Sequence, residues 1–413
     1  MRILLVTHHY TPEASAPQQR WEALVARFVA AGHEVAVLAP PPHYPGGRLH
    51  TRDPRVRPGA VSRGRHGEMV HRVAFREHGQ GLSSRAFDQL VSATDAVRVA
   101  LTRFRGRHRP DLVVATAPAI PAVPSGLVIG AALKVPVVLE MRDAWPDLLR
   151  FRQEWDTTTP GLGGLPLTRA GAWMLSFALT GLQRHAAAVV TTTESFADVL
   201  SARGVQHVRT IRNGAHGCSL PRARVVDRPG ELRVLYLGTV GRLQGLGTAV
   251  AAAARARAAG TPVRLRIIGE GAGANGLRAQ ARHAGASVEV LPSVPAAEVA
   301  AHHDWADTVL VSLRDLEPLR WCVPSKLYEL LAAGRHVTGV VDGESADIIR
   351  STGAGHVVPP GDADALAQLW ARLHADRSLL DVGPEGRRWA AVHASDDQLA
   401  KDYLEVLQEV VRA

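Results

Sequence analysis

The sequence predicts an α/β protein with two domains, each built around a parallel sheet. Short apolar runs alternate with amphipathic stretches at helical spacing along residues 1–214, and the same alternation starts again at residue 231. Such alternation is typical of parallel sheets whose strands are joined by helices. The chain also has 413 residues, which is more than one hydrophobic core usually serves.

The first half opens with a strand, a helix and a second strand. Residues 2–7 form a short apolar run, residues 17–31 place apolar side chains on one helical face, and residues 34–39 are apolar again. Further strands are predicted at 111–115, 135–140 and 188–192. Residues 41–85 break this rhythm, because Pro, Gly, Arg and His dominate them. They predict a long loop, a feature that often carries function in a compact domain.

The second half repeats the same order. Residues 232–237 form its first strand, residues 238–247 a glycine-rich turn, and residues 248–259 an alanine-rich helix. Further strands are predicted at 264–268, 287–291, 308–312 and 337–341, with helices at 276–284 and 325–333. We therefore expect a first domain over 1–214, a linker over 215–230, a second domain over 231–390, and a C-terminal segment over 391–413 with an amphipathic helix at 397–411.

Composition favours a globular protein in a reducing compartment. Hydrophobic residues make up 46% of the chain and charged residues 21%. The two cysteines, Cys218 and Cys322, exclude a disulfide framework and a cysteine-based zinc site. The apolar run at the N-terminus is too short for a signal peptide, and prolines interrupt the longest apolar stretch, at 115–139. We therefore expect a cytoplasmic protein.

The positive charge is concentrated between Arg48 and Arg109. This window holds 14 arginines and five acidic residues, an excess of nine that equals the net charge of the whole chain. A local basic excess suggests an anionic partner: a phosphate, an acidic membrane surface or a nucleic acid. Because the window lacks the interleaving of aromatic residues that base stacking requires, no nucleic-acid partner is predicted. The alternative is a plain solvated surface in an arginine-rich protein, whose only lysines are Lys134, Lys326 and Lys401.

The segment PSKLYELLAAG, residues 324–334, carries the most chemical information. Pro-Ser favours a helix start, where the first backbone N–H groups lack partners. Lys326 lies in that first turn, against the preference of the helix dipole for acidic residues there, and an anion bound between them would explain it. Glu329 follows on the same helical face. A lysine for phosphate and a glutamate for ribose hydroxyls make a nucleotide-diphosphate site; the alternative is a surface ion pair.

Two glycine-containing turns follow predicted strands of the second half. Residues 237–247 (LGTVGRLQGLG) connect a strand to a helix, where backbone N–H groups can face a diphosphate. A tight turn also needs glycine for purely structural reasons. In the second turn, IIGEG, Glu270 either contacts a ligand at the carboxyl end of the sheet or is an exposed turn residue.

Two polar segments follow strands of the first half. Arg142 and Asp143, in EMRDAWPD, either contact the sugar or acceptor or form a structural ion pair. His9 and Tyr10, in HHYTP, either contact the acceptor or the donor diphosphate, or belong to a structured turn. The 19 histidines show no metal-ligand spacing such as HExxH, so no metal site is predicted.

Together these segments resemble GT-B glycosyltransferases of family 4, especially bacterial members that build surface glycans. The likeness spans nearly the whole chain, and the order and spacing of its motifs are more specific than any one of them. It rests on AAGHEVAVLAP, VLEMRDAWPD, VVTTTESFADVLSARGV, RTIRNG, LYLGTVGRLQGL, IIGEG, VPSKLYELLAAG and GAGHVVPPGDADALA.

The resemblance implies two Rossmann-like domains whose parallel sheets face an interdomain cleft, with the last helix crossing back to the first domain. It implies transfer with retention of anomeric configuration and without metal or other cofactor, because basic side chains and helix N-termini stabilise the departing diphosphate. Arg242 and Lys326 would contact the diphosphate and Glu329 the ribose. The donor site would also include Gly241, Glu270, Ser325 and Leu327, the catalytic residues would be Asp143 and Arg142, and His9 and Tyr10 would contact the acceptor.

Two positions depart from the family pattern. Members often carry two glutamates eight positions apart in the second domain, and Trp321 occupies the position of the first one here. The glycine-rich turn often has a lysine where this chain has Gln244. We expect Lys326 to supply that charge.

The sequence therefore predicts transfer of a hexose or N-acetylhexosamine-type sugar from a nucleotide diphosphate sugar, with UDP as the expected nucleotide, to an acceptor hydroxyl. The expected acceptor is a glycan, a lipid-linked sugar or a small molecule, and the expected process is polysaccharide or glycolipid synthesis at the inner face of the cell membrane. The alternatives are a sugar-nucleotide epimerase of the same fold and a natural-product glycosyltransferase with a soluble acceptor.

Overall fold

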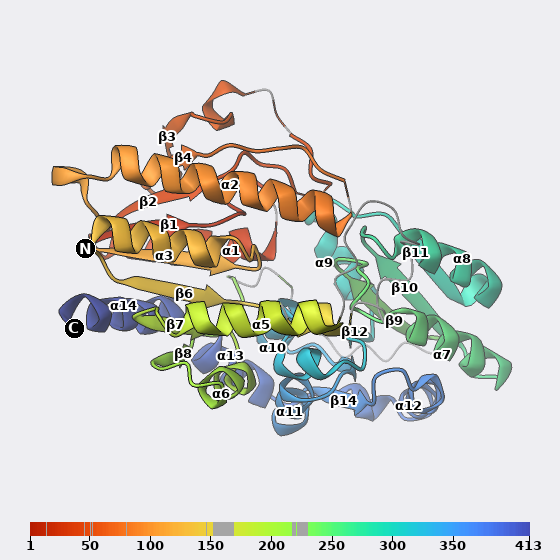
Figure 1. The fold of residues 1–413 in the computed structure, drawn as a ribbon. Coiled ribbons are helices and arrows are strands. Elements are labelled where there is room, and N and C mark those ends of the chain that lie inside the picture. Colours follow the sequence, from red (N-terminus) through yellow and green to blue (C-terminus); the bar gives the residue numbers. More distant parts are fainter. Residues whose placement is uncertain are drawn as a thin grey trace. The chain divides into compact units, whose positions relative to one another are not determined.

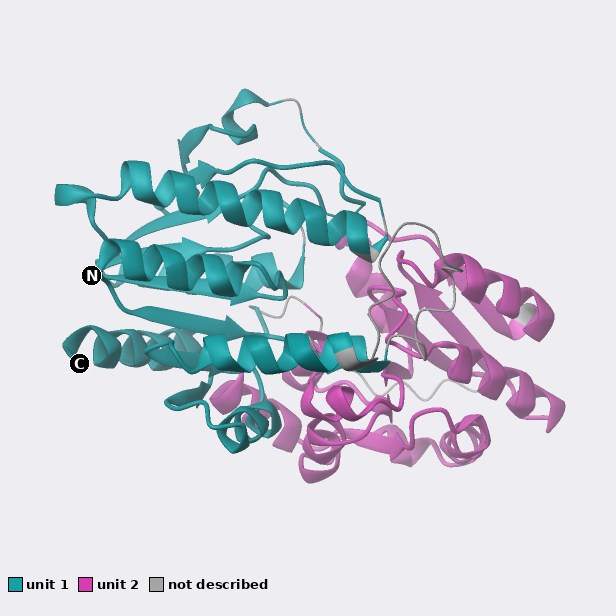
Figure 2. Ribbon diagram, in the orientation of Figure 1, with its two compact units in different colours: residues 1–152, 159–216, 396–413 teal, residues 153–158, 217–395 magenta. Residues whose placement is uncertain are grey.

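The computed structural model consists of two compact α/β units (Figures 1 and 2). The structure describes residues 1–13, 15–44, 46–49, 51, 53–79, 81–145, 147–151, 169–216, 220 and 230–413. Unit 1 contains the described residues of 1–151, 169–216 and 396–413, and unit 2 contains 220 and 230–395. Each unit is built on a largely parallel sheet, so the predicted fold class of two α/β domains is confirmed.

Unit 1 has an eight-stranded sheet in the order β3-β4-β2-β1-β5-β6-β7-β8. Neighbouring strands run parallel except β3, which is antiparallel to β4. The strands are β1 (Arg2–Val6), β2 (Glu34–Ala39), β3 (Val61–Arg63), β4 (Met69–Arg72), β5 (Leu112–Ala117), β6 (Val137–Met141), β7 (Ala188–Thr191) and β8 (Val208–Thr210).

Helices cover both faces of this sheet. The helices α2 (Leu82–Arg103), α3 (Ala122–Leu133) and α5 (Arg169–Gln183) lie side by side on one face (Figure 1). On the other face α1 (Ala16–Ala30) packs against α14 (Asp396–Arg412), where the ring centroids of Trp21 and Tyr403 are 5.6 Å apart. Ser15 caps α1 by accepting a hydrogen bond from the backbone N–H of Gln18, at 3.3 Å. The remaining α-helix of this unit that the structure describes is α6 (Glu194–Ala202).

The loop predicted over 41–85 is partly wrong. Residues 61–63 and 69–72 form the hairpin β3–β4, and β4 pairs in parallel with β2. Periodicity does not reveal these strands, because they are only three and four residues long and contain Ser, His and Arg. Val70 is the side chain of the hairpin that enters the core, at 2% exposure.

Unit 2 has a six-stranded parallel sheet in the order β11-β10-β9-β12-β13-β14. Its strands are β9 (Leu232–Leu237), β10 (Val263–Ile268), β11 (Val288–Leu291), β12 (Thr308–Ser312), β13 (Val337–Val340) and β14 (Gly355–Val358). Its helices are α7 (Gly247–Ala258), α8 (Ala274–Ala284), α9 (Ala296–Trp305), α10 (Ser325–Ala333), α11 (Glu344–Ser351), α12 (Ala363–Ala375) and α13 (Glu385–His393).

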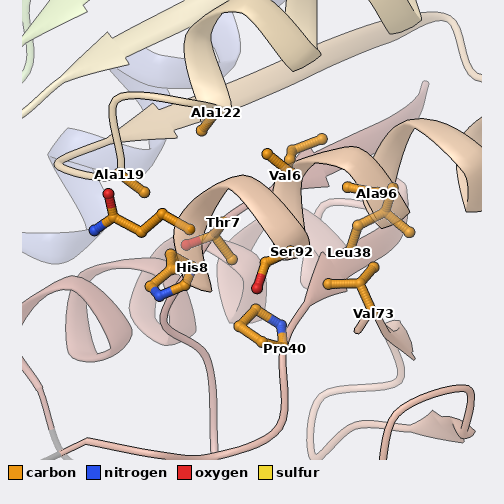
Figure 3. A pocket seen from close by; sticks show the side chains of 12 residues that line it. Val6, Thr7, His8, Leu38, Pro40, Val73, Ser92, Ala96, Ala119 and Ala122 are labelled. Carbon is orange, nitrogen blue, oxygen red and sulfur yellow. The ribbon is translucent and has the colours of Figure 1, made fainter. Parts of the chain in front are cut away.

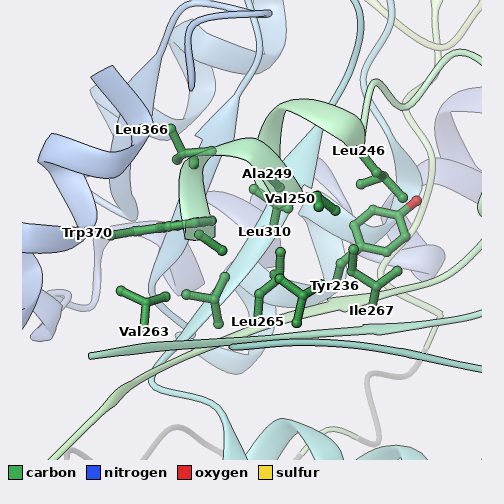
Figure 4. Packing of buried hydrophobic residues seen from close by; sticks show 14 of the residues in the cluster. Tyr236, Leu246, Ala249, Val250, Val263, Leu265, Ile267, Leu310, Leu366 and Trp370 are labelled. Carbon is green, nitrogen blue, oxygen red and sulfur yellow. The ribbon is translucent and has the colours of Figure 1, made fainter. Parts of the chain in front are cut away.

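The core of unit 2 lies between this sheet and the helices α7 and α12. Trp370 of α12 and the small side chains of α7, such as Ala249, pack over Leu265 and Leu310 of the sheet (Figure 4). Because many side chains of α7 in this core are alanines, the large ring of Trp370 fits beside them and is 0% exposed.

Chain order reverses at one point in each parallel sheet. In unit 1 this switch lies between β1 and β5, and in unit 2 it lies between β9 and β12. Open α/β sheets bind ligands outside the carboxyl ends of the strands at such points. The polar turns predicted to be functional after β1 and β9 therefore occupy the expected ligand positions. Within the described residues, no helix is long and apolar enough to cross a lipid bilayer.

Candidate functional site

The glycine-rich turn after β9 is held in place by backbone hydrogen bonds to two neighbouring turns. Gly238 N donates to Ile268 O at 3.0 Å, and Val240 N donates to Glu270 O at 2.9 Å. On its other side, Arg314 N donates to Leu243 O at 2.8 Å. The turn is thus fixed between the segments that follow β10 and β12.

Lys326 comes to this turn from the first turn of α10. Its Nζ lies 3.7 Å from the ring centroid of Tyr236, and it is buried with no hydrogen-bond partner in the described parts of the chain. Burial lowers the pKa of Lys326 to about 7, and the nearby charge of Glu329 opposes this shift. Gly238 has φ +143°, a backbone conformation that favours glycine, and a Cβ there would lie 2.8 Å from Nζ. The structure therefore brings together the glycine-rich turn, Lys326 and Glu329.

The start of α10 also provides backbone donors. The helix begins at Ser325, and no side chain caps its N-terminus. Ser325 is half-buried, whereas the side chain of Leu327 is fully buried in the core and its N–H donates to Pro324 O at 2.9 Å. Leu327 therefore positions the helix and does not present its side chain to a ligand.

Glu270, Arg242 and Gly241 lie around the same turn. Glu270 is exposed and accepts from Arg278 Nη2 of α8 at 2.7 Å, so it is held at the rim. The backbone carbonyl of Arg242 accepts from Arg314 Nε at 2.6 Å. A Cβ at Gly241 would lie 2.5 Å from Gln244 Oε1, so a side chain there would require Gln244 to move.

In unit 1, Arg142 and Asp143 follow β6. Arg142 is buried, and its Nη2 donates to Asn213 Oδ1 at 3.4 Å. Its Nε and Nη1 have no hydrogen-bond partner among the described residues, although Nε forms an ion pair with Glu140 Oε1 at 3.9 Å. Burial lowers the pKa of Arg142 and raises the pKa of Asp143, while the positive charge of Arg142 opposes the shift of Asp143. Next to them, Glu140 accepts from Arg20 Nη2 at 3.1 Å. This arrangement leaves unused donors and a half-buried carboxylate at the end of the sheet.

The two residues predicted to contact the acceptor lie in different environments. His9 Nδ1 lies 2.5 Å from Glu13 Oε1, and Glu13 Oε2 accepts the backbone N–H of His43 at 3.0 Å. Tyr10 is 1% exposed, and its hydroxyl donates to Glu68 Oε1 at 2.9 Å. Tyr10 is therefore a core residue, and only His9 lies in the polar loop after β1.

Sequence reasoning missed a cluster of histidines beside His9. His8, His43 and His78 surround Asp88 of α2, and burial lowers the pKa of His8 and lowers the pKa of His43 to about 4. His8 also borders a small pocket between the ends of β1 and β2 and the helix α2, near Thr7, Pro40 and Ser92 (Figure 3). The available signal was that His8 and His43 each follow one of two adjacent parallel strands.

Two family models match the chain in succession. Residues 15–214 match a glycosyl transferase 4-like domain, and residues 231–376 match the glycosyl transferases group 1. The chain belongs to the glycosyltransferases. This confirms the resemblance at the level of a GT-B glycosyltransferase. No curated protein matches the sequence of this glycosyltransferase.

Solved structures share the fold of this glycosyltransferase over its whole length. Sucrose-phosphate synthase from Thermosynechococcus elongatus has a TM-score of 0.74 at 17% identity, over 100% of this chain and 99% of that chain. HepE from Anabaena, in complex with UDP-glucose, has a TM-score of 0.67 at 14% identity, over 99% and 100%. The lipopolysaccharide outer core galactosyltransferase WaaB has a TM-score of 0.60 at 12% identity, over 99% of each chain. At these identities the likeness shows the GT-B fold alone.

Proposed function

We propose that this glycosyltransferase moves a hexose or N-acetylhexosamine-type sugar from a UDP-sugar to an acceptor hydroxyl, with retention of anomeric configuration. The observation that carries the proposal is Lys326, a buried cation without a hydrogen-bond partner in the described residues, at a helix N-terminus and against a glycine-rich turn. Leaving such a group unpaired costs free energy, and a bound diphosphate would recover it. The UDP-glucose complex of HepE supports UDP as the nucleotide.

The donor residues have distinct roles in this proposal. Lys326, Arg242 and the first N–H groups of α10 stabilise the negative charge that develops on the leaving diphosphate. Glu329, which lies on the same helix near Lys326, accepts hydrogen bonds from the ribose hydroxyls. These fixed positive groups replace a divalent cation at the diphosphate, so the transfer needs no metal there.

Unit 1 supplies the acceptor side. Arg142, whose Nη1 has no hydrogen-bond partner in the described residues, and Asp143, with a raised pKa, contact the transferred sugar or the acceptor, and His9 contacts the acceptor from the loop after β1. The acceptor hydroxyl attacks from the face that the diphosphate leaves. The departing diphosphate oxygen takes the proton, so no protein base is required.

An acceptor attached to a lipid, in surface-glycan synthesis at the inner face of the cell membrane, fits the surface of unit 1. Large apolar side chains are exposed along the helix layer α2–α3–α5, among them Trp173 and Phe177, which are 57% and 65% exposed. In the window Arg48–Arg109, Arg72 is buried and the other described arginines are exposed. Exposed aromatic and basic side chains together are typical of a surface that binds anionic lipid.

The test is a donor and acceptor screen with the intact protein. Nucleotide sugars carrying UDP, GDP or dTDP are first ranked by thermal shift, since a ligand that binds the native state raises its stability. The best donor is then incubated with lipid-linked and soluble acceptors, and products are identified by mass spectrometry and NMR. Retained α- or β-configuration in a glycosylated product supports the proposal. Epimerised donor without transfer indicates the epimerase instead, and no shift with any nucleotide sugar contradicts the donor site.

A further inference from the structure

A small pocket lies in unit 1 at the carboxyl ends of four adjacent strands. It is bordered by His8 after β1, Pro40 after β2, Val73 after β4 and Ala119 after β5. Helix α2 borders another side, where Ser92 faces the pocket (Figure 3). This position includes the switch between β1 and β5, and open α/β sheets bind ligands at such switches. The pocket therefore lies where a ligand of this unit is expected.

The pocket is largely apolar and has room for one methyl group. Eight of its twelve lining residues have apolar side chains. Half of these are alanines, on α2 and at or just before the start of α3: Ala93, Ala96, Ala119 and Ala122. The cavity volume is about 20 Å³, and roughly 10–15 Å³ is enough for one group of the size of water. A methyl group is of similar size and, unlike water, needs no hydrogen-bond partner.

The polar side chains of the lining leave one amide group for a ligand. Thr7 and Ser92 donate to backbone carbonyl oxygens, at 3.1 and 2.9 Å, and His8 Nε2 pairs with Asp88 Oδ2 at 3.2 Å. The fourth polar residue is Gln89 of α2, which is half-buried and whose amide forms no hydrogen bond with a described residue. Because an amide both donates and accepts, it can bind a hydroxyl or an amide beside a buried methyl group.

We propose that this pocket binds a methyl group of the acceptor sugar and that Gln89 binds a polar group next to it. Two classes of sugar carry such a methyl group: N-acetylhexosamines, on the acetyl group, and 6-deoxyhexoses, on C6. A plain hexose would leave the pocket empty. The assignment of this ligand as the acceptor rests on the proposed function, which places His9, the residue after His8, at the acceptor.

Saturation-transfer NMR with the intact protein measures which protons of a bound sugar contact the pocket, and it requires no donor. The probes are N-acetylglucosamine, 6-deoxyglucose and glucose, which differ in their methyl groups. Two variants fill the pocket from different elements: Ala93→Val on α2 and Ala122→Val at the start of α3. They should remain folded by circular dichroism, because they add atoms where the structure leaves space. The matched control is Ala86→Val, exposed on α2.

In the wild type and in Ala86→Val, the methyl protons of one methyl-bearing sugar should receive the strongest saturation. Glucose should bind about tenfold more weakly, since one methyl group in an apolar pocket discriminates to about this extent. The sugar that gives the signal identifies the source of the methyl group. Both pocket-filling variants should bind that sugar only as weakly as glucose. The proposal is overturned if neither methyl-bearing sugar binds more tightly than glucose, or if both pocket-filling variants bind as the control does.

The affinity for UDP separates this proposal from the proposed donor site. Ala93→Val and Ala122→Val should bind UDP like the wild type, because the donor residues lie in unit 2. If Lys326→Ala does not weaken UDP binding, the donor site is wrong, and the sugar-binding result still decides the pocket. With a donor in hand, the pocket-filling variants should raise KM for the methyl-bearing acceptor about tenfold at little change in kcat. A loss of kcat at unchanged KM would contradict a binding role for the pocket.

Discussion

Lys326 shows how one residue links the stability of unit 2 to binding. Its ammonium group is buried, and contact with the face of Tyr236 compensates only part of the lost hydration. Burial accordingly lowers its pKa to about 7. The Lys326 ammonium group therefore favours binding of an anion, because a bound anion would stabilise its charge and accept its hydrogen bonds.

This pKa predicts that UDP affinity falls as the pH rises above 7. Below pH 7 Lys326 is protonated in the free enzyme and binds the diphosphate directly. Above pH 7 it is neutral, so binding must take up a proton, and the affinity falls by up to about tenfold per pH unit. Calorimetry at pH 6.5, 7.5 and 8.5 measures both the affinity and the proton uptake. The Lys326→Met variant should show no such slope; an equal slope in both proteins would assign it to another group.

Sequence patterns predicted individual site residues unevenly. The proximity of Lys326 to the glycine-rich turn could be predicted because the helix start and the turn are both local signals. The core position of Tyr10 could not, because its partner Glu68 lies 58 residues away. The cluster around Asp88 was missed for the same reason, since its members come from four separate segments.

At the scale of elements, a buried histidine just before β13 contacts a half-buried histidine of β14. His336 is 3% exposed, its Nε2 lies 3.0 Å from His356 Nδ1, and its Nδ1 lies 2.8 Å from Thr308 Oγ1. Burial lowers the pKa of His336 to about 3, and the charge of His356 adds to this effect. This position at the edge of the sheet therefore favours the neutral form of the His336 imidazole.

Unit 2 should consequently lose stability in mild acid. Below pH 6.5 the unfolded chain binds a proton at His336 and the folded chain does not, so the free energy of unfolding falls by about 1.4 kcal/mol per pH unit for this residue. From pH 7 to pH 5 the loss is about 2 kcal/mol. Urea unfolding at pH 7 and at pH 5 measures this loss of unfolding free energy. His336→Leu should show a smaller loss than wild type, whereas the exposed control His185→Leu should not; identical losses in both variants would exclude His336 as the cause.

The helix layer α2–α3–α5 predicts binding to anionic vesicles. Burying the side chains of Trp173 and Phe177 in a bilayer interface should contribute roughly 1.5–3 kcal/mol each at most, and arginines near the surface about 1 kcal/mol each. Co-sedimentation should therefore be stronger with anionic than with neutral vesicles and weaken as salt rises. Trp173→Ser with Phe177→Ser should reduce binding at least about tenfold, while Val392→Ser, exposed on α13, should not. If binding is equal for anionic and neutral vesicles and is unchanged in both variants, this face is a plain solvated surface.

Long apolar elements were predicted well and short polar ones poorly. The strands β2, β9 and β12 and the helix α10 have the bounds that the sequence predicted, because apolar residues dominate each of them. The hairpin β3–β4 was not predicted, since its strands pair through backbone groups and bury few side chains.

At the scale of the whole molecule, the chain leaves unit 1 and returns to it. Helix α14 contributes Leu399, Tyr403 and Leu407 to the core of unit 1, after unit 2 has been completed. Arg27 of α1 pairs with Asp397 at 2.6 Å at the start of this helix. The amphipathic pattern of the segment predicted a helix, and its position on α1 follows from complementary apolar faces that no local pattern encodes.

The donor residues of unit 2 predict a transfer reaction that does not depend on a metal ion. Transfer should persist in excess EDTA without Mg²⁺ or Mn²⁺, because Lys326, Arg242 and the start of α10 replace a cation at the diphosphate. Activity is assayed with EDTA and then with Mg²⁺ or Mn²⁺ restored separately. Recovery with Mg²⁺ or Mn²⁺ would contradict the metal-free transfer.

The affinity for UDP, measured by calorimetry at pH 6.5, tests the central claim most directly. Lys326→Ala and Glu329→Ala should each weaken binding by roughly 1.5–3 kcal/mol, or about 10- to 150-fold, because each removes a charge-assisted hydrogen bond. Lys401→Ala, at an exposed position of α14, removes the same charge elsewhere and should bind UDP like the wild type. If all three variants bind UDP with wild-type affinity while remaining folded, the nucleotide does not bind at α10 and the proposed donor site is wrong.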